Sequence, residues 1–295
     1  MRKYFIIIPI LILVYFLSGK DNSSIKTENK RIETDNLIVN MSNYGLENIL
    51  LSEYLNGVIA CEMPALFHDE AIKAGIVAAR TFYLYKYESD NDYKPSNGDQ
   101  CFFSESKRKE NWRDNYELYN EKILNNINLT KNEVITYNGS VIKAFYFSMS
   151  NGYTEDAVNV FKKSEPYLVS VISDYDKDVK NNISSKSISV NEFKEKLNVN
   201  NDIVINNIVR DSSNRVSEIV INNVNYDGVY FRKLFDLRST DFEIEFNDQE
   251  VIITTRGYGH GVGMSQWGAN EMAKMGYEYK DILKYYYKDV EIMYK

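Results

Sequence analysis

The hydrophobic period of this chain changes near residue 130. Before that point, apolar residues recur at helical spacing over residues 52–63 and 70–87, and residues 108–127 also have the pattern of a helix. After it, short runs of β-branched and aromatic residues alternate with turn residues. Helices return between residues 265 and 287. This order predicts an α+β fold in which helices pack on antiparallel strands.

Capping residues and prolines place the ends of the first two predicted helices. Ser52 has the side chain of an N-cap, and Glu53 puts a carboxylate into the first turn. Pro64 disfavours helical geometry at Met63, so we expect the first helix to end there. Asp69 can cap the second helix.

Later elements are marked in the same way. Asn138-Gly139, between two β-rich runs, predicts a hairpin with a two-residue turn. Ser265 can cap a helix that Gly276 ends. Residues 165–255 hold short β runs and one helical piece, VNEFKEKL, and we expect them to form a β-rich subdomain.

The N-terminal segment, MRKYFIIIPILILVYFLSGK, has two basic residues before an uninterrupted apolar run. This pattern is typical of an exported chain, with Arg2 and Lys3 left in the cytoplasm. Because no small-x-small cleavage site follows, we expect residues 1–19 to remain as a single membrane anchor rather than to be removed as a signal peptide. Residues 20–40 are then a largely polar tether, and residues 41–295 form the extracytoplasmic domain.

The charge balance argues against a nucleic-acid partner. The chain has 35 basic and 42 acidic residues, a net charge of −7 and a pI near 5.1. It also lacks a basic stripe that could follow a phosphate backbone. We therefore expect no nucleic-acid binding.

The two cysteines, Cys61 and Cys101, leave several possibilities open. In an exported protein they can form one disulfide, and both can equally stay free. With His68 and His260 they make a minimal zinc set, but the spacings match no standard zinc signature. A cysteine–histidine hydrolase is disfavoured, because the neighbouring Glu62 would raise the pKa of the Cys61 thiol.

One carboxylate lies on an apolar stripe of the first predicted helix. Leu55, Val58, Ile59 and Glu62 follow one another at positions i, i+3, i+4 and i+7, so Glu62 faces the core. An unpaired buried carboxylate is costly, so the group either pairs with a cation or has a raised pKa. Pairing with Arg80 would make Glu62 structural, whereas a protonated Glu62 in an apolar pocket can serve as a general acid.

The segment RGYGHGVGMSQWGA places four alternate glycines around His260, which predicts close backbone approach or unusual φ and ψ angles. It fits neither a dinucleotide fingerprint nor a Walker loop. His260, Ser265, Gln266 and Trp267 put polar groups and one large ring beside this backbone, as in many sugar sites. A tight glycine-rich strand with a core histidine is the alternative.

The segment SMSNGYTE offers Ser148, Ser150 and Asn151 at the end of a predicted strand. An ordinary Asn-Gly turn accounts for the same residues.

Three segments together, in this order, resemble the stage II sporulation protein D family of endospore-forming bacteria. They are YLNGVIACEMPALFHDEAIKAGIVAARTFYLYK, AFYFSMSNGYTE and RGYGHGVGMSQWGANEMAKMGYEYKDILKYYY. The resemblance covers about residues 50–290 and implies a peptidoglycan lytic transglycosylase that acts during engulfment. Such an enzyme cleaves the MurNAc–GlcNAc β-1,4 bond without water and leaves a 1,6-anhydro-MurNAc end.

The resemblance also implies a location and partners. The domain would lie in the intermembrane space of the sporulating cell, held by its N-terminal anchor in the cell membrane. Its partners would be the glycan strands, stage II sporulation protein P, which strips stem peptides from them, and stage II sporulation protein M.

The resemblance further implies roles for single residues. The catalytic glutamate of the family's E-M-P motif corresponds to Glu62, and one carboxylate suffices because the 6-hydroxyl of the substrate replaces the nucleophilic water. The residues expected to line the sugar cleft are Arg80, Ser148, Asn151, His260, Ser265 and Gln266. Many members bind zinc through a His and a second Cys upstream of the position of Cys101, but YESDNDYKPSNGDQC supplies neither. We therefore expect no zinc and no other cofactor.

Two other functions stay open. The first is a glycoside hydrolase that uses Glu62 together with Asp69 or Glu70, since ordinary glycosidases need two carboxylates. The second is a non-catalytic glycan-binding module.

Overall fold

The structure, a computed structural model, describes residues 33–247 and 249–295. The predicted membrane anchor, residues 1–19, lies outside the described residues, and so do residues 20–32 of the predicted tether. Within the described ranges, no helix is both long and apolar enough to cross a bilayer.

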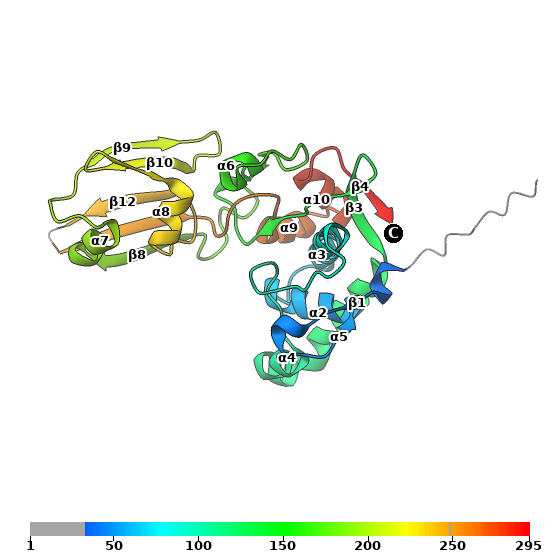
Figure 1. The fold of residues 1–295 in the computed structure, drawn as a ribbon. Helices are drawn as coiled ribbons and strands as arrows, with labels where there is room; N and C mark the ends of the chain where they lie inside the picture. Colours follow the sequence, from blue (N-terminus) through cyan, green and yellow to red (C-terminus); the bar gives the residue numbers. More distant parts are fainter. Residues whose placement is uncertain (1–32, 248) are drawn as a thin grey trace, which may run out of the picture. The chain divides into compact units, whose positions relative to one another are not determined.

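Helices and small, mostly antiparallel sheets make up the fold, in agreement with the predicted mixture of helices and antiparallel strands (Figure 1). The α-helices are α2 (Leu51–Glu62), α3 (Asp69–Ser89), α4 (Glu105–Trp112), α5 (Tyr116–Leu129), α6 (Ala157–Phe161), α7 (Val190–Leu197), α8 (Gly228–Leu234), α9 (Gln266–Lys274) and α10 (Tyr279–Tyr286). The 3-10 helices are η1 (Thr34–Asn36), η2 (Ser42–Tyr44) and η3 (Arg113–Asn115).

The strands are short; some pair with the next strand in sequence, and others, such as β3 with β15, pair across long distances in sequence. They are β1 (Ile38–Val39), β2 (Ile49–Leu50), β3 (Glu133–Tyr137), β4 (Ser140–Val141), β5 (Tyr146–Phe147), β6 (Gly152–Tyr153), β7 (Ile172–Ser173), β8 (Ile183–Ser189), β9 (Ile205–Arg210), β10 (Val216–Ile221), β11 (Val224–Asp227), β12 (Phe242–Phe246), β13 (Glu250–Arg256), β14 (Met264–Ser265) and β15 (Glu291–Tyr294). The sheets are β1-β2, β15-β3-β4, β6-β7, β5-β14, β11-β10-β9 and β12-β13-β8. The β5-β14 pair is parallel, and it joins the segments that carry SMSNG and the alternate glycines.

Helix α3 lies at the centre of the larger hydrophobic core. Its sequence EAIKAGIVAA is rich in small residues, and Ala71, Ala74 and Ala78 are fully buried. Small side chains let neighbouring helices approach closely, and α2, α5, α9 and α10 all pack against α3 (Figure 1). The core therefore brings the end of α2 close to the start of α9.

A second hydrophobic core is formed by the strands and helices between β8 and β13 (Figure 1). Phe231 and Phe193 both pack against Phe235, with ring centroids 4.5 Å and 4.7 Å from the Phe235 ring. This core runs from Ile188 to Ile253, inside the predicted β-rich region. Its residues form a hydrophobic cluster of their own, distinct from the cluster around α3.

The predicted hairpin is confirmed. Tyr137 pairs with Ser140 across the turn, and the two turn residues, Asn138 and Gly139, have φ angles of 49° and 76°. Two positive φ angles are what a type I′ turn requires, and Asn-Gly tolerates them.

The predicted helix caps need correction. Leu50 is the N-cap of α2, and Ser52 lies inside its first turn. His68 caps α3, because its Nδ1 accepts the backbone N–H of Glu70 at 3.3 Å. Asp69 is therefore the first residue of the helix rather than its cap.

The helix predicted over residues 108–127 consists of two helices, α4 and α5, joined by η3. The break falls at Arg113, whose φ of 47° lies in the left-handed region. A right-handed helix cannot pass through such a residue, so the chain turns there.

Residues 33–40 belong to the folded domain, so the predicted tether is too long at its C-terminal end. Val39 is fully buried, and Asp35 is 3% exposed. Asp35 forms an ion pair with Arg80 of α3, whose Nη2 lies 3.0 Å from Asp35 Oδ2. A polar sequence alone did not reveal this long-range pairing.

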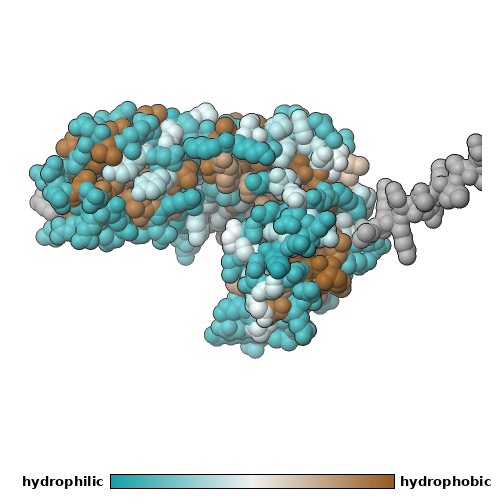
Figure 2. Space-filling view, viewed as in Figure 1, coloured by the Kyte–Doolittle hydropathy of each residue, from teal (hydrophilic) through white to brown (hydrophobic). Residues whose placement is uncertain are grey.

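The surface is mostly hydrophilic on the face that Figure 2 draws. Hydrophobic side chains gather there in the area of β1 and β2, two strands whose exposed residues include Ile38 and Leu50.

Candidate active site

Glu62 is the last residue of α2, which ends because Met63 takes extended geometry before Pro64. Its side chain is half-buried and is held from two sides. The backbone N–H of Cys101 donates to Oε1 at 2.8 Å, and the Nε2 amide of Gln266 donates to Oε2 at 3.3 Å. Elements far apart in sequence thus fix the orientation of this carboxyl group.

Burial raises the pKa of Glu62 above its usual range, and the hydrogen bonds from Cys101 and Gln266 lower it by less. Across residues 33–247 and 249–295, no lysine or arginine contributes to this balance. Glu62 therefore keeps its proton to higher pH than an exposed glutamate does, as a general acid requires.

Arg80 does not pair with Glu62, so the ion pair considered as the structural alternative was wrong. The Arg80 side chain is fully buried and contacts Asp35, and its Nη1 donates to the carbonyl of Glu133 at 3.2 Å. It has no exposed surface to offer a sugar, which also corrects its predicted place in the cleft. Its role is to anchor η1 and β3 to α3.

A pocket of about 580 Å³ opens beside Glu62. The aromatic members of its wall pack on one another: the rings of Phe145 and Phe161 stack with centroids 4.5 Å apart, and Phe82 lies 5.8 Å from Phe145. Aromatic faces next to a carboxyl group are typical of sugar sites. The residues that line the pocket are Glu62, Phe82, Gly98, Asp99, Gln100, Ala144, Phe145, Tyr146, Phe161 and His260.

His260 lies in this pocket, with its ring 5.6 Å from that of Phe145 and 5.5 Å from that of Phe161. Its Nδ1 accepts the backbone N–H of Val262 at 3.0 Å, so the proton of the neutral ring sits on Nε2. Burial, followed by the positive charges of Arg232 and Arg215, lowers the pKa of His260 to about 3. His260 is thus a neutral group near neutral pH, suited to hydrogen bonding rather than to proton transfer.

The alternate glycines allow this arrangement, which confirms the predicted close backbone approach. Gly257, Gly259, Gly261 and Gly263 all have positive φ angles. A Cβ atom on Gly263 would lie 2.0 Å from the carbonyl oxygen of Phe145. Only glycine therefore lets the segment that carries His260 and Gln266 lie against β5.

The other predicted cleft residues make structural contacts. Ser265 is fully buried, caps α9 by accepting the N–H of Gly268 at 3.1 Å, and donates to Asp176 Oδ2 at 2.7 Å. Asn151 Nδ2 donates to the carbonyl of Ser213 at 2.9 Å and to Asp241 Oδ2 at 3.0 Å. Of the predicted cleft residues, the structure brings Gln266 and His260 to Glu62 or its pocket.

Ser148 contributes its backbone. Its carbonyl accepts the N–H of Trp267 at 3.1 Å, at the start of α9. Trp267 packs edge-on against Phe67, with ring centroids 4.7 Å apart. These contacts hold the first turn of α9, and with it Gln266, close to β5.

Asp176, which no sequence pattern indicated, joins the segments behind the pocket. It accepts the Ser150 backbone N–H at 2.8 Å and the Ser265 hydroxyl at 2.7 Å. Burial raises its pKa, and these hydrogen bonds oppose that effect. Asp176 lies in an irregular stretch without periodicity, so its partners became visible only in three dimensions.

The carboxylates proposed as second catalytic groups lie elsewhere. Asp69 accepts from Asn126 Nδ2 at 3.1 Å, and Glu70 Oε2 accepts the backbone N–H of Tyr279 at 2.9 Å. Neither residue lines the Glu62 pocket.

Asp99 is the acidic residue that shares the pocket with Glu62. Burial alone would raise its pKa, but hydrogen bonds from Lys86 and Ser96 and the Lys86 charge outweigh burial and lower it. Lys86 Nζ lies 2.9 Å from Asp99 Oδ1. The pocket therefore contains one carboxyl group disposed to keep its proton and one held as a paired anion.

Cys61 and Cys101 form a disulfide, with their Cα atoms 5.6 Å apart. This settles the alternatives for the cysteines and leaves no thiol for a cysteine–histidine hydrolase. The bond ties the residue before Glu62 to the residue whose N–H donates to Glu62. In the part of the chain that the structure describes, no group of three His, Cys, Asp or Glu side chains is placed to bind a metal.

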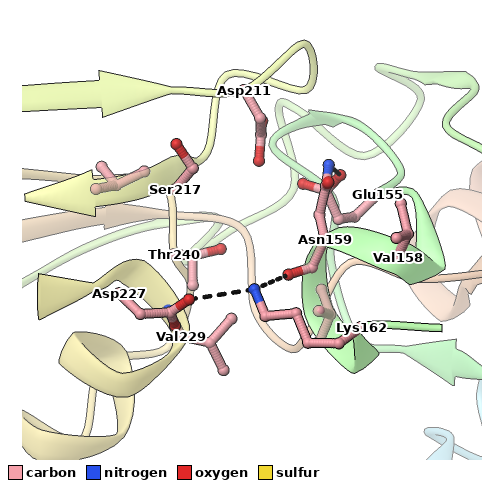
Figure 3. A pocket seen from close by; sticks show the side chains of 11 residues that line it. Glu155, Val158, Asn159, Lys162, Asp211, Ser217, Asp227, Val229 and Thr240 are labelled. Atoms are coloured by element: carbon pink, nitrogen blue, oxygen red, sulfur yellow. Dashed lines mark hydrogen bonds and ion pairs between the residues drawn. The ribbon is translucent and has the colours of Figure 1, made fainter.

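A second pocket of about 450 Å³ is lined by residues of α6, β10 and α8, among others, and does not include Glu62 (Figure 3). Charged groups of this pocket already have partners: Lys162 Nζ lies 3.2 Å from Asp227 Oδ2, and Glu155 accepts from the amide of Asn159 at 2.8 Å. The Glu62 pocket is therefore the stronger candidate for a catalytic site.

Comparison with known proteins supports the family resemblance that the sequence motifs indicated. A family model described as stage II sporulation protein matches residues 42–137. Stage II sporulation protein D of Bacillus amyloliquefaciens is 40% identical over 262 residues, which cover 85% of this chain and 76% of the relative. Stage II sporulation protein D of Bacillus subtilis (strain 168) is 35% identical over 314 residues, covering 97% and 92%. The amidase enhancer of Bacillus subtilis (strain 168) is 29% identical over 290 residues, covering 79% of this chain and 39% of the relative.

Proposed function

Because this chain belongs to the stage II sporulation protein D family, we propose that it is a peptidoglycan lytic transglycosylase that acts during sporulation. The observation that supports this most is the state of Glu62. It is a single carboxyl group with a raised pKa, oriented by two hydrogen bonds, in a pocket walled by aromatic rings. A single oriented carboxyl group with a raised pKa is what cleavage of a glycan by one carboxylate requires.

In the first step, Glu62 donates its proton to the glycosidic oxygen between MurNAc and GlcNAc. The bond from C1 of MurNAc to that oxygen breaks, and the GlcNAc end leaves with the proton as a hydroxyl group. Burial raises the pKa of Glu62, which favours the protonated form that a general acid needs. The hydrogen bonds from Cys101 and Gln266 then stabilise the carboxylate that forms.

In the second step, the carboxylate of Glu62 accepts the proton of the MurNAc 6-hydroxyl. The oxygen of that hydroxyl bonds to C1, which closes the 1,6-anhydro ring and returns Glu62 to its protonated form. No water is consumed in this step. The aromatic rings that line the pocket favour the reaction by excluding water from C1. His260, neutral near pH 7, can donate a hydrogen bond from Nε2 to a sugar hydroxyl.

Hydrolysis is the second candidate, because Asp99 shares the pocket with Glu62. A paired, ionised Asp99 could activate water while Glu62 acts as the acid, as in two-carboxylate glycosidases. The pairing with Lys86 makes Asp99 a weaker base and favours the route without water.

The setting of the reaction is part of the proposal. We place the enzyme at the membrane of the sporulating cell, anchored by residues 1–19, with its domain in the intermembrane space during engulfment. Its substrate there would be glycan strands prepared by stage II sporulation protein P, in a complex with stage II sporulation protein M. The family resemblance supports this setting.

The masses of the digestion products test the reaction. Glycan strands without stem peptides are digested with the full chain, and the fragments are measured by mass spectrometry. We expect fragments that are lighter by one water than the hydrolysis products, because each new end is a 1,6-anhydro ring. Ordinary reducing ends would favour hydrolysis with Asp99, and binding without any release would favour a glycan-binding module.

Gln266 provides a prediction on pH dependence. Replacing Gln266 with methionine removes a hydrogen bond that lowers the pKa of Glu62, so this pKa rises further. A general acid works in its protonated form, so we expect the alkaline limb of kcat/KM against pH to move to higher pH. We also expect kcat to fall on the order of tenfold, because the carboxyl loses one of its two orienting partners. The matched control is Gln249→Met, at an exposed position, which should leave both unchanged. An unchanged alkaline limb in Gln266→Met would contradict the role given to Gln266.

A further inference from the structure

Lys143 stands over the aromatic wall of the Glu62 pocket. Its Nζ lies 4.7 Å from the ring centroid of Phe145 and 5.8 Å from that of Phe161. Both rings line the pocket, as does the next residue in sequence, Ala144. The half-buried ammonium group is therefore next to the place where a sugar would stack.

Within the described part of the chain, no carboxylate pairs with this ammonium group. In residues 33–247 and 249–295, no acidic side chain lies within ion-pair distance of Lys143 Nζ, and no oxygen accepts a hydrogen bond from it. The neighbouring lysines differ in this respect: Lys86 pairs with Asp99 at 2.9 Å, and Lys163 with Glu165 at 3.0 Å.

The surroundings of Lys143 are unfavourable to a charge. Burial, followed by the positive charges of Lys163 and Lys86, lowers its pKa, and Glu165 opposes this. Cation–π contact with the two rings offsets part of the free-energy cost of burying the charge. It does not provide the N–H donors of the ammonium with acceptors, and the described residues provide none either.

The missing acceptor can come from the substrate. The two alternating sugars of peptidoglycan differ in one substituent: MurNAc carries a lactyl ether that ends in a carboxyl group, and GlcNAc does not. A carboxylate that reaches Lys143 from a sugar stacked on Phe145 and Phe161 would form a charge-assisted hydrogen bond beside an apolar wall.

We propose that Lys143 is a specificity-determining residue that binds the lactyl carboxylate of MurNAc and so sets which of the two alternating sugars lies beside Glu62. This inference rests on the proposed function. The assignment matters for the reaction, because the anhydro ring closes on the MurNAc side of the broken bond. A strand shifted by one sugar would place the wrong 6-hydroxyl at Glu62.

Binding measurements on a non-cleaving protein test this proposal. The full chain carrying Glu62→Gln is titrated calorimetrically with a GlcNAc–MurNAc tetrasaccharide that has free lactyl carboxylates. It is then titrated with the same tetrasaccharide after conversion of those carboxylates to methylamides. We expect the free-carboxylate ligand to bind about tenfold more tightly, and this preference to shrink as salt concentration rises.

Variants of Lys143 separate charge from packing. Adding Lys143→Met keeps an unbranched apolar stem, so we expect it to abolish the preference while leaving affinity for the methylamide unchanged. Lys143→Arg should restore most of the preference. The matched control, Lys284→Met, removes an exposed lysine that does not act on Lys143 and should keep the full preference.

Several results would overturn the assignment. They are equal affinity of the parent protein for both ligands, an equal loss on both ligands in Lys143→Met, or loss of the preference in Lys284→Met. Because binding is measured without cleavage, failure of the proposed reaction is distinguishable: ordinary reducing ends would contradict the reaction and leave the ligand preference standing. A protein that binds neither tetrasaccharide would contradict both.

Discussion

Glu62→Gln is expected to lower the rate of glycan cleavage by about a hundredfold to ten-thousandfold, the usual contribution of a general acid. Glutamine keeps the shape of the side chain and an oxygen that can accept the Cys101 N–H, but it has no proton to donate. The measurement is the initial rate of fragment release from glycan strands by the full chain. Glu121→Gln, on the exposed face of α5, is the matched control and should keep the wild-type rate.

The same variant should fold at least as stably as the wild type near neutral pH. Burial raises the folded-state pKa of Glu62, so its ionised form is disfavoured in the folded protein. A group of this kind contributes stability below its unfolded pKa and loses that contribution as pH rises through its folded pKa. Glutamine avoids that loss, so any gain in the free energy of unfolding should appear near neutral pH and vanish at acidic pH. Unfolding of Glu62→Gln at a lower denaturant concentration than wild type at pH 7 would mean that its inactivity reports a damaged fold.

Removing the disulfide is expected to cost about 4 kcal/mol of stability, since it closes a loop with a sequence separation of 40 residues. We also expect slower cleavage in the double variant Cys61→Ala/Cys101→Ala. The bond holds the segment of Cys101, whose N–H orients Glu62, and whose neighbours Gly98, Asp99 and Gln100 line the pocket. Denaturant unfolding and initial rates measure the two effects.

Reducing agent provides the control for this prediction. The wild type treated with dithiothreitol should match the double variant in stability and rate, whereas the double variant should not respond to it. Equal stability of oxidised wild type and double variant would show that the cross-link does not restrain this segment.

The features of the site that local sequence patterns predict are those set within one element. The position of Glu62 on the apolar stripe of α2, and the end of that helix before Pro64, follow from spacing and from the geometry before proline. The close packing of the alternate glycines follows from the absence of a side chain, since a Cβ on Gly263 would meet the Phe145 carbonyl. The Asn138-Gly139 hairpin follows from turn chemistry in the same way.

The partners of charged residues could not be predicted, because they are set by tertiary contacts. The sequence suggested Glu62, in the preceding helix, as the partner of Arg80. The observed partner is Asp35, which lies in a segment whose composition is that of a tether. Asp99 enters the pocket from an irregular loop that the disulfide ties to α2. Such loops have no period to analyse, so the second acidic group of the pocket was sought wrongly in Asp69 and Glu70.

Digestion in oxygen-18-labelled water tests the central claim, that Glu62 cleaves the glycan without a water molecule. The full chain digests glycan strands in labelled and ordinary water, and the fragment masses are compared. The proposed mechanism predicts identical masses in both solvents, because the oxygen that closes on C1 comes from the substrate. One labelled oxygen in each newly formed end would contradict it and would show that water attacks C1.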